Sequence, residues 1–219
     1  MIVTTPSNGD AAEELLDVVE PDGTYVTTLP RSVVHDEGLW HQTFHCLVVR
    51  SAAPARVLLQ RRKSSARAFP SLLDLSAAGH LSAGESPPDG VREIREEIGL
   101  DVDPSRLVSL GRRLLVDDGG EGHNREITHV FLLTDDTPLA VLRLDPAEVD
   151  GFLEMAVTDL GRLLADPAAS VTVPEVDTAG TMRETVCTMA DLVPAIDSYW
   201  RVLAVMAERL VAGLEPLGI

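Results

Sequence analysis

The sequence predicts a mixed α/β (α+β) fold, in which a mixed β-sheet lies between helices and a helical extension follows at the C-terminal end. The strongest local patterns run in the order strands, helix, strands, helices, which is typical of such a domain. The 219 residues are 45% apolar and only 4% aromatic, so they suffice for one aliphatic core. Apolar residues recur with helical spacing over 189–213. We therefore expect a flexible N-terminus over 1–13, a main domain over 14–170, and a helical extension over 171–219 packed on that domain.

The first predicted elements are two pairs of strands. Residues 15–19 and 24–28 are expected to form a hairpin, because the Pro-Asp-Gly sequence at 21–23 is typical of a turn. The segments 43–50 and 55–62 carry the strongest strand patterns, and only a short loop with a proline separates them. We expect these two strands to pair antiparallel.

A helix is predicted over 87–98. Ser86 is a favourable N-cap, the prolines that follow it suit a first helical turn, and Gly99 provides a stop. The preceding segment 69–88 is rich in small residues, glycine and proline, which indicates a close approach of the backbone to another group. The remaining expected elements are strands over 107–116 and 126–134, a glycine-rich turn over 117–124 between them, an amphipathic helix over 157–165, and helices within 189–213.

The helix over 87–98 carries an acidic edge formed by Glu93, Glu96 and Glu97. Their spacing i, i+3, i+4 places the three carboxylates on the side opposite the apolar face. They occupy the last turns, where the helix dipole disfavours anions, and only Arg92 is placed to offset their charge. A solvated acidic face is one explanation. The alternative is a site for Mg²⁺ or Mn²⁺, which a further carboxylate in the preceding loop, Glu85, favours because hard oxygen ligands suit these ions.

The residues around this helix resemble the signature of the Nudix hydrolases. Gly79, five residues, Glu85, six residues, and then the run REIREEIGL that begins at Arg92 follow the family pattern. The family pattern has seven residues between the positions of Glu85 and Arg92, so this chain is one residue short there. The resemblance covers roughly residues 15–165.

This resemblance implies a loop–helix–loop that holds a divalent metal against a diphosphate. The implied metal set is Gly79, Glu85, Glu93, Glu96 and Glu97, and the implied catalytic set is Glu93, Glu96, Glu97 and Arg92, which orients the carboxylates. Such enzymes hydrolyse a nucleoside diphosphate linked to another group by attack of water on phosphorus. A bound metal ion agrees with the charge balance, because a strongly acidic protein needs one to neutralise an anionic substrate.

The flanking segments 31–35, 38–41, 58–63, 69–70 and 74–80 resemble the branch of the family close to isopentenyl-diphosphate isomerase. In that isomerase three histidines and two glutamates hold a metal. The matching positions in this chain are His35, His41, His80 and Glu126, with Asn124 where the other glutamate would be. Ala78 replaces the catalytic cysteine, which argues against isomerase chemistry because a principal acid–base group is missing. The three histidines are either metal ligands or structural residues hydrogen-bonded near strand ends.

Three further features have open alternatives. Arg61, Arg62 and Lys63 follow a strand and are candidate substrate-binding residues for phosphate, or they form a charged strand end that keeps the edge soluble. Glu148 lies in a loop from which some family members supply a catalytic base, or it is an ordinary exposed carboxylate. Trp200 is expected in the core or at a partner interface, and a homodimer through the C-terminal helices is a hypothesis.

The composition excludes several classes of protein. With 18 basic and 35 acidic residues the net charge is −17, which repels nucleic acid and anionic membranes. The sequence shows neither a secretory signal pattern nor an apolar run long enough to span a bilayer. Cys46 and Cys187 lie too far apart to indicate a disulfide framework, so we expect two buried thiols and a reducing compartment. The expected partner is a small-molecule diphosphate, and the expected location is cytoplasmic.

Three functional hypotheses follow. The first is a metal-dependent pyrophosphohydrolase that uses Mg²⁺ or Mn²⁺. The second is residual isopentenyl-diphosphate isomerase activity, which Ala78 disfavours. The third is a non-catalytic module that binds a nucleotide-like ligand, which the three adjacent glutamates disfavour because a pure binder has no need to keep repelling carboxylates together.

Overall fold

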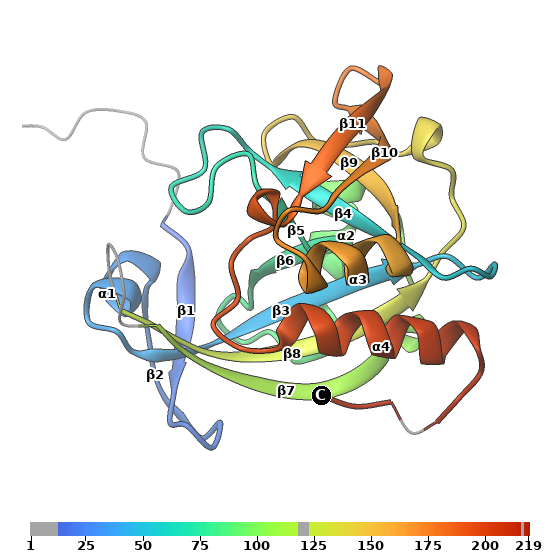
Figure 1. The fold of residues 1–219 in the computed structure, drawn as a ribbon. Helices are drawn as coiled ribbons and strands as arrows, with labels where there is room; N and C mark the ends of the chain where they lie inside the picture. The colour runs from blue at the N-terminus through green and yellow to red at the C-terminus, as the bar shows by residue number, and fades with distance from the viewer. Residues whose placement is uncertain (1–12, 118–122, 216) are drawn as a thin grey trace, which may run out of the picture.

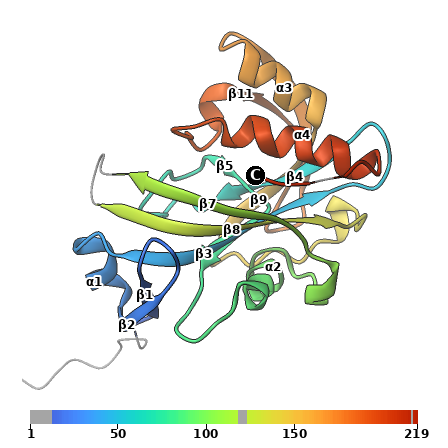
Figure 2. The same ribbon diagram turned by 90° about the horizontal axis from the view of Figure 1, so that it is seen from below.

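A sheet with helices on both faces forms the protein, as predicted. The computed structural model describes residues 13–117, 123–215 and 217–219. Within them the strands join in one sheet (Figure 1). Helix α2 covers one face, and helices α3 and α4 cover the other (Figure 2). The expected flexible N-terminus over 1–13 lies almost wholly outside the described residues, and so does most of the glycine-rich turn over 117–124.

The chain runs through its elements in the following order. They are β1 (Leu15–Val19), β2 (Tyr25–Pro30), α1 (Arg31–Asp36), β3 (Trp40–Val49), β4 (Arg56–Arg62), β5 (Leu73–Asp74), β6 (Ala77–His80), α2 (Val91–Ile98), β7 (Val108–Asp117), β8 (Asn124–Thr134), β9 (Val149–Ala156), α3 (Val157–Ala165), β10 (Ser170–Asp177), β11 (Met182–Thr188) and α4 (Tyr199–Val211). The predicted hairpin of β1 and β2, the strands β7 and β8, and the helix α3 are all confirmed.

Strands β3 and β4 pair differently from the prediction. They are antiparallel neighbours, but the ladder between them contains only the pair Val49↔Val57. Along its length β3 instead pairs in parallel with β8, while β6 pairs with its other edge. Strand β4 pairs with β9 and β5. The two strands therefore diverge beyond their shared end, because each finds a longer partner elsewhere in the chain. This divergence opens the sheet at its centre.

The alternation of side chains on β3 connects it to two separate cores. Phe44, Cys46 and Val48 pack in one core with Ile94 and Ile98 of α2. Leu47 and Val49 point to the opposite face and pack in the other core, which includes the apolar residues of α3 and α4. The acidic helix α2 and the C-terminal helix α4 thus lie on opposite faces of the same strand (Figure 2).

The prediction of a helical extension over 171–219 is wrong for the first part of that range. Residues 170–188 form the hairpin of β10 and β11, which continues the sheet beyond β9. Val171 and Val173 are buried whereas Thr172 between them is exposed, which is the period of a strand with one covered face. The helix begins only at Tyr199, after the extended segment that contains Pro194.

A buried ion pair holds this hairpin to the main domain. The Glu175 carboxylate on β10 is fully buried and accepts hydrogen bonds from Arg61 at 2.6 Å and Arg183 at 3.0 Å. Although burial alone would raise it, the hydrogen bonds from Arg61, Arg183 and Thr185 hold the pKa of Glu175 below its usual range. Arg61 is therefore occupied by a structural contact, on the face of the sheet that carries α4.

The helix α2 forms where the sequence predicts it, with a different first turn. Ser86 and Asp89 form the predicted cap as a capping box, but residues 87–90 are a short 3₁₀ helix and the α-helix begins at Val91. Gly99 ends the helix in the left-handed conformation, with φ of 76°. Among the described helices none is long and apolar enough to cross a bilayer.

The apolar face of helix α4 packs against other parts of the same chain. Tyr199, Trp200, Leu203, Ala204 and Ala207 are buried in the core that α4 shares with α3 and the sheet. The expectation that Trp200 is a core residue is confirmed. Both cysteines are free and buried, as predicted.

Candidate functional site

A large cavity lies where β3 and β4 diverge, and both faces of the sheet contribute to it. Its volume is about 750 Å³. Glu93, Glu96 and Glu97 of α2 line one part, and the segment from Val193 to Trp200 lines another. The sheet contributes His45 from β3, Gln60 from β4 and residues 78–80 from β6. Glu148 also lines the cavity, as an exposed loop carboxylate.

Arg92 organises the carboxylates at this site. Its Nη1 donates to Glu93 at 2.7 Å and to Glu96 at 3.1 Å. Its Nε and Nη2 bind both oxygens of Glu85, at 2.7 and 3.1 Å, and Nη2 also donates to the carbonyl oxygen of His80. The structure therefore places Glu85 beside Arg92 despite the missing residue in the loop. Since Glu85 also accepts from the Ser82 amide, its oxygens are used to position Arg92.

Glu97 lies at the centre of the opening in the sheet. Its carboxylate is 7% exposed and accepts from Gln60 Nε2 on β4 and from the Ala78 amide on β6. Glu93 and Glu96 share Arg92, whereas Glu97 connects β4 with β6 and is near enough to Glu93 to be affected by its charge. Burial raises the pKa of Glu93 to about 7, and burial together with the charge of Glu93 raises the pKa of Glu97.

At Gly79 the space that a side chain would fill is occupied by the Glu93 carboxylate. A Cβ atom at this position would lie 2.1 Å from Oε1 of Glu93, well inside van der Waals contact. The absence of a side chain lets the Glu93 carboxylate rest directly on β6. This explains in physical terms why the motif contains glycine, which the sequence alone placed in the metal set without a reason.

Replacing Gly79 with alanine is expected to displace the Glu93 carboxylate without unfolding the protein, because the group that must move is the end of a flexible side chain. A displacement of about 1 Å at a reacting centre can cost roughly a hundredfold in rate, so we expect a loss of that order. Steady-state hydrolysis and thermal melting would measure the two effects. The matched control is Gly161→Ala, since a Cβ there meets no atom within 4 Å. Equal activity in the two variants would contradict this account.

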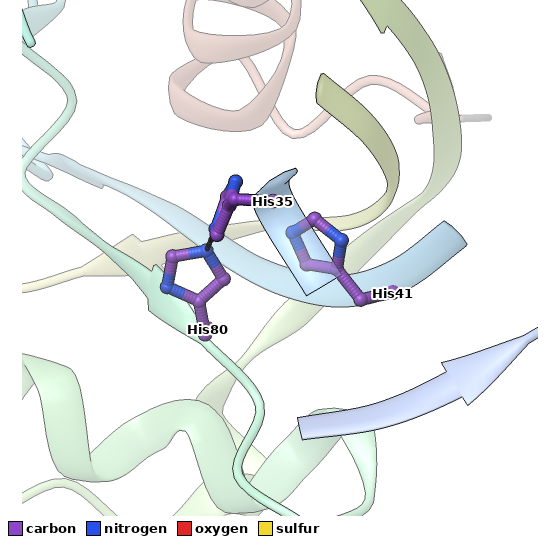
Figure 3. A group of neighbouring side chains, drawn as sticks. All are labelled: His35, His41 and His80. Carbon is purple, nitrogen blue, oxygen red and sulfur yellow. Dashed lines mark hydrogen bonds between the residues drawn. The ribbon is translucent and has the colours of Figure 1, made fainter. Parts of the chain in front are cut away.

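Three histidines form a second group in the same region (Figure 3). The ligand atoms of His35, His41 and His80 all lie within 4.8 Å of one another, and among the described residues this is the group of potential metal ligands that meets that limit. His35 Nε2 lies 3.0 Å from His80 Nε2. His41 bonds the Leu39 carbonyl oxygen through Nδ1, and its buried Nε2 has no hydrogen-bond partner.

Glu126 lies beside this histidine group. On the paired strands β3 and β8 it is the direct neighbour of His41. Asn124 Nδ2 donates to Glu126 at 2.7 Å, and the buried Oδ1 of Asn124 has no partner. The resemblance to the isomerase branch therefore selected residues that do come together in space. Burial lowers the pKa values of His35 and His80, which favours the neutral rings that bind metal ions.

The cations that line the cavity are already paired. Among the described residues the pairs are Arg31 with Glu14, Arg62 with Asp74, Lys63 with Asp150, Arg92 with Glu85, Glu93 and Glu96, and Arg113 with Asp197. Of the three predicted phosphate-binding residues, Arg62 and Lys63 line the cavity, whereas Arg61 does not and is bound to Glu175. No local pattern in the sequence indicates the pair of Arg61 with Glu175, because the two residues are 114 positions apart.

Two residues that line the cavity, Tyr199 and His45, were not predicted from the sequence as site residues. Tyr199 from the start of α4 lies with its hydroxyl 2.9 Å from His45 Nδ1, and both residues line the cavity. Tyr199 lies within the segment 189–213 that was expected to be helical, and its contact with β3 spans 154 residues. Nothing local in the sequence marks either residue as part of a site.

Several known proteins are similar to this chain in sequence or in fold. A family model described as the NUDIX domain matches residues 39–176. Over 153 residues the chain is 33% identical to an uncharacterized Nudix hydrolase of Clostridium acetobutylicum, a match that covers 69% of this chain and 74% of that protein. Over 97 residues it is 33% identical to an isopentenyl-diphosphate Delta-isomerase of Cutibacterium acnes, covering 43% of this chain and 48% of the isomerase. The crystal structure of DR0079 from Deinococcus radiodurans has a similar fold, with a TM-score of 0.54, 20% identity, and coverage of 69% of this chain and 90% of that one.

Proposed function

The chain belongs to the Nudix hydrolases and is a pyrophosphohydrolase, and from this premise we propose that it uses Mg²⁺ or Mn²⁺ to split a nucleoside diphosphate linked to another group, or a related organic diphosphate. The observation that carries the proposal is the burial of the Glu93 and Glu97 carboxyl groups and its effect on their pKa values. Glu97 is buried and Glu93 is partly buried at the cavity, and desolvation raises the pKa of each. A bound dication would stabilise both in the ionised form.

The charges around the cavity support a requirement for metal. Every described cation that lines it already has an acidic partner, so an incoming diphosphate finds no free positive charge. Carboxylate oxygens are the ligands that Mg²⁺ and Mn²⁺ prefer, and the donor set of Glu93, Glu96 and Glu97 fits these ions. When bound, such an ion neutralises phosphate charge and lowers the pKa of a water molecule.

The chain's own residues then have distinct roles. Arg92 holds Glu93 and Glu96 in place, and Glu85 fixes Arg92 from the other side. Gln60 and the Ala78 amide orient Glu97 at the opening of the sheet. The half-buried Arg62 and Lys63, which line the cavity, bind phosphate oxygens by exchanging their present acidic partners for the substrate. Glu148 also lines the cavity and is the candidate for the general base.

The two alternative functions are less well supported. Isomerase activity needs an acid–base group where Ala78 lies, and the Ala78 backbone here serves as a donor to Glu97. A non-catalytic binding module would gain nothing from two buried carboxylates that repel one another.

A release assay tests the proposed function. The protein would be incubated with a panel of nucleotide sugars, dinucleotides, nucleoside triphosphates and isoprenoid diphosphates, with Mg²⁺ or Mn²⁺ and with EDTA. Release of phosphate or a nucleoside monophosphate that requires the metal is expected for at least one compound. Conversion of isopentenyl diphosphate into an isomer without phosphate release would favour the isomerase instead. Hydrolysis that EDTA leaves unchanged would overturn the metal requirement.

We also propose that His35, His41 and His80 hold a second metal ion, with Glu126 as an oxygen ligand. The unpartnered Nε2 of buried His41 supports this, because a buried acceptor without a partner costs free energy. Imidazole nitrogens suit transition metals such as Zn²⁺ or Fe²⁺, whereas carboxylates suit Mg²⁺ and Mn²⁺, so this site would differ in metal preference from the glutamates.

Exchange of His41 for glutamine is expected to remove this second metal and leave the first. Co²⁺ absorption spectra and metal analysis after dialysis would measure binding, and Co²⁺ bound by imidazole should lose its signal in His41→Gln but keep it in Glu97→Gln. His129→Gln is the control, since His129 lies on β8 and bonds Gln42 outside the group. An identical Co²⁺ spectrum in His41→Gln and the parent protein would show that the histidines are structural.

A further inference from the structure

The start of helix α4 brings one polar group into the cavity. Tyr199 is 7% exposed, and its hydroxyl lies 2.9 Å from Nδ1 of His45 on β3. His45 lies on the face of β3 that carries α4, and both side chains line the same cavity as the α2 glutamates. Because β3 and β4 diverge, groups from the two faces of the sheet meet there. Tyr199 lies outside the residues that the family model matches, so this contact is a feature of the chain's C-terminal part.

One contact of the Tyr199 ring and two hydrogen bonds at the start of α4 hold this residue in place. The guanidinium carbon of Arg113 lies 4.4 Å from the ring centroid, and Arg113 Nε donates to Asp197 at 2.9 Å. Asp197 also accepts from the Tyr199 amide, which ties the start of the helix to the same network. The next residue, Trp200, is held through its indole N–H by the Val193 carbonyl oxygen. The phenol is therefore positioned by backbone and side-chain contacts before any ligand arrives.

The hydrogen bond between Tyr199 and His45 determines where the imidazole carries its proton. Among the described residues the Tyr199 hydroxyl has one hydrogen-bond partner, His45 Nδ1. A buried hydroxyl needs an acceptor for its proton, and Nδ1 is the acceptor within reach. If Nδ1 carried the proton instead, the phenol hydrogen would be left without an acceptor. With the phenol as the donor, Nδ1 is the bare nitrogen and the proton of the neutral ring is on Nε2.

We propose that Tyr199 is a positioning residue that fixes His45 as a neutral hydrogen-bond donor, through Nε2–H, to an oxygen of the substrate on the α4 side of the cavity. This inference rests on the proposed function. The oxygen would belong to a phosphate of the diphosphate or to the bond that joins it to the second group, since those are the acceptors that such a substrate must present. A neutral donor suits this site, because it binds a phosphate oxygen without repelling a nearby dication.

The tautomer of His45 tests the proposal without any substrate. A long-range ¹H–¹⁵N correlation spectrum distinguishes protonation at Nδ1 from protonation at Nε2, and His45→Gln identifies the His45 signals. We expect protonation at Nε2 in the parent protein. We expect a mixture of the two tautomers in Tyr199→Phe, where the phenyl ring is kept and the donor is lost. Protonation at Nδ1 in the parent protein would overturn the proposal.

Kinetics with Mg²⁺ and the best substrate of the panel provide the second readout. Tyr199→Phe is expected to lower kcat/KM about tenfold and the melting temperature by only a few degrees, because one hydrogen bond and the orientation of a donor are lost. His45→Leu removes the donor and is expected to cost about ten- to a hundredfold, which is the range for a hydrogen bond to a charged group. His45→Gln should recover part of this loss, since its amide can place an N–H near the position of Nε2. A merely structural His45 would give equal losses in the leucine and glutamine variants.

Tyr25→Phe is the matched control. Tyr25 is 59% exposed on the β1–β2 hairpin, where its hydroxyl contacts Thr28. Its activity should equal that of the parent protein. If the parent protein hydrolyses no compound, the proposed function fails and the substrate role of His45 fails with it. If the parent protein is active and Tyr199→Phe is equally active, the inference fails while the proposed function stands.

Discussion

Glu97→Gln is expected to reduce metal-dependent hydrolysis by about a thousandfold or more while the protein remains folded. Glu97 is the most deeply buried of the three helix glutamates, and it lies where the two diverging strands border the cavity. The loss of one charged metal ligand removes several kcal/mol of transition-state stabilisation, and each 1.36 kcal/mol is about tenfold in rate. The variant keeps the size of the side chain and an oxygen acceptor for Gln60 or the Ala78 amide. Its stability in EDTA should equal or exceed that of the parent protein, because a buried charge is lost.

Measured kcat at saturating Mn²⁺ and Mg²⁺, together with urea denaturation, would test this expectation. Glu208→Gln on the exposed side of α4 is the control, because it removes the same charge far from the cavity. Unchanged turnover in Glu97→Gln would remove the main support for the metal assignment. A loss of turnover accompanied by unfolding would show instead that Glu97 is needed for structure.

Most helices and strands could be predicted because their signals are local. The turn at 21–23, the cap at Ser86 and the stop at Gly99 are all determined by a few adjacent residues. The long ladder between β3 and β8 could not be predicted, since its partners are separated by 85 residues in the sequence, as in the contact of Thr43 with Thr128. Proximity along the chain favoured β4 as the partner of β3, and this choice concealed the opening in the sheet.

The same distinction applies to the candidate site. The acidic edge of α2 was visible because three glutamates recur with helical spacing in one short segment. The contact of Gly79 with Glu93 and the pair of Arg61 with Glu175 depend on elements that approach only in the folded protein. The hairpin of β10 and β11 was missed because Pro174 and several charged residues interrupt its apolar pattern.

The pH dependence of stability is expected to differ between the parent protein and Glu93→Gln when metal is removed. Burial raises the pKa of Glu93 to about 7 from a usual value near 4.5. Between these two values the folded protein keeps a proton that the unfolded chain releases, so this carboxyl lowers the free energy of unfolding as the pH rises from 4.5 to 7. Above the folded pKa the full penalty applies, and it amounts to about 3 kcal/mol. Glutamine has no such penalty. The free energy of unfolding of Glu93→Gln, relative to that of the parent protein, should therefore increase as the pH rises from 4.5 to 7.

Urea denaturation in EDTA at a series of pH values would measure this difference. The comparison of two proteins is needed because the lowered pKa values of His35, His45, His80 and His129 act in the opposite direction, raising stability as the pH increases toward their unfolded value of 6.5. Both proteins share that contribution, so it cancels. Mg²⁺ or Mn²⁺ should then stabilise the parent protein more at high pH than at low pH, and stabilise Glu93→Gln less, because the metal requires the ionised carboxylate. Parallel curves for the two proteins, with and without metal, would mean that Glu93 neither carries a buried charge nor binds the ion.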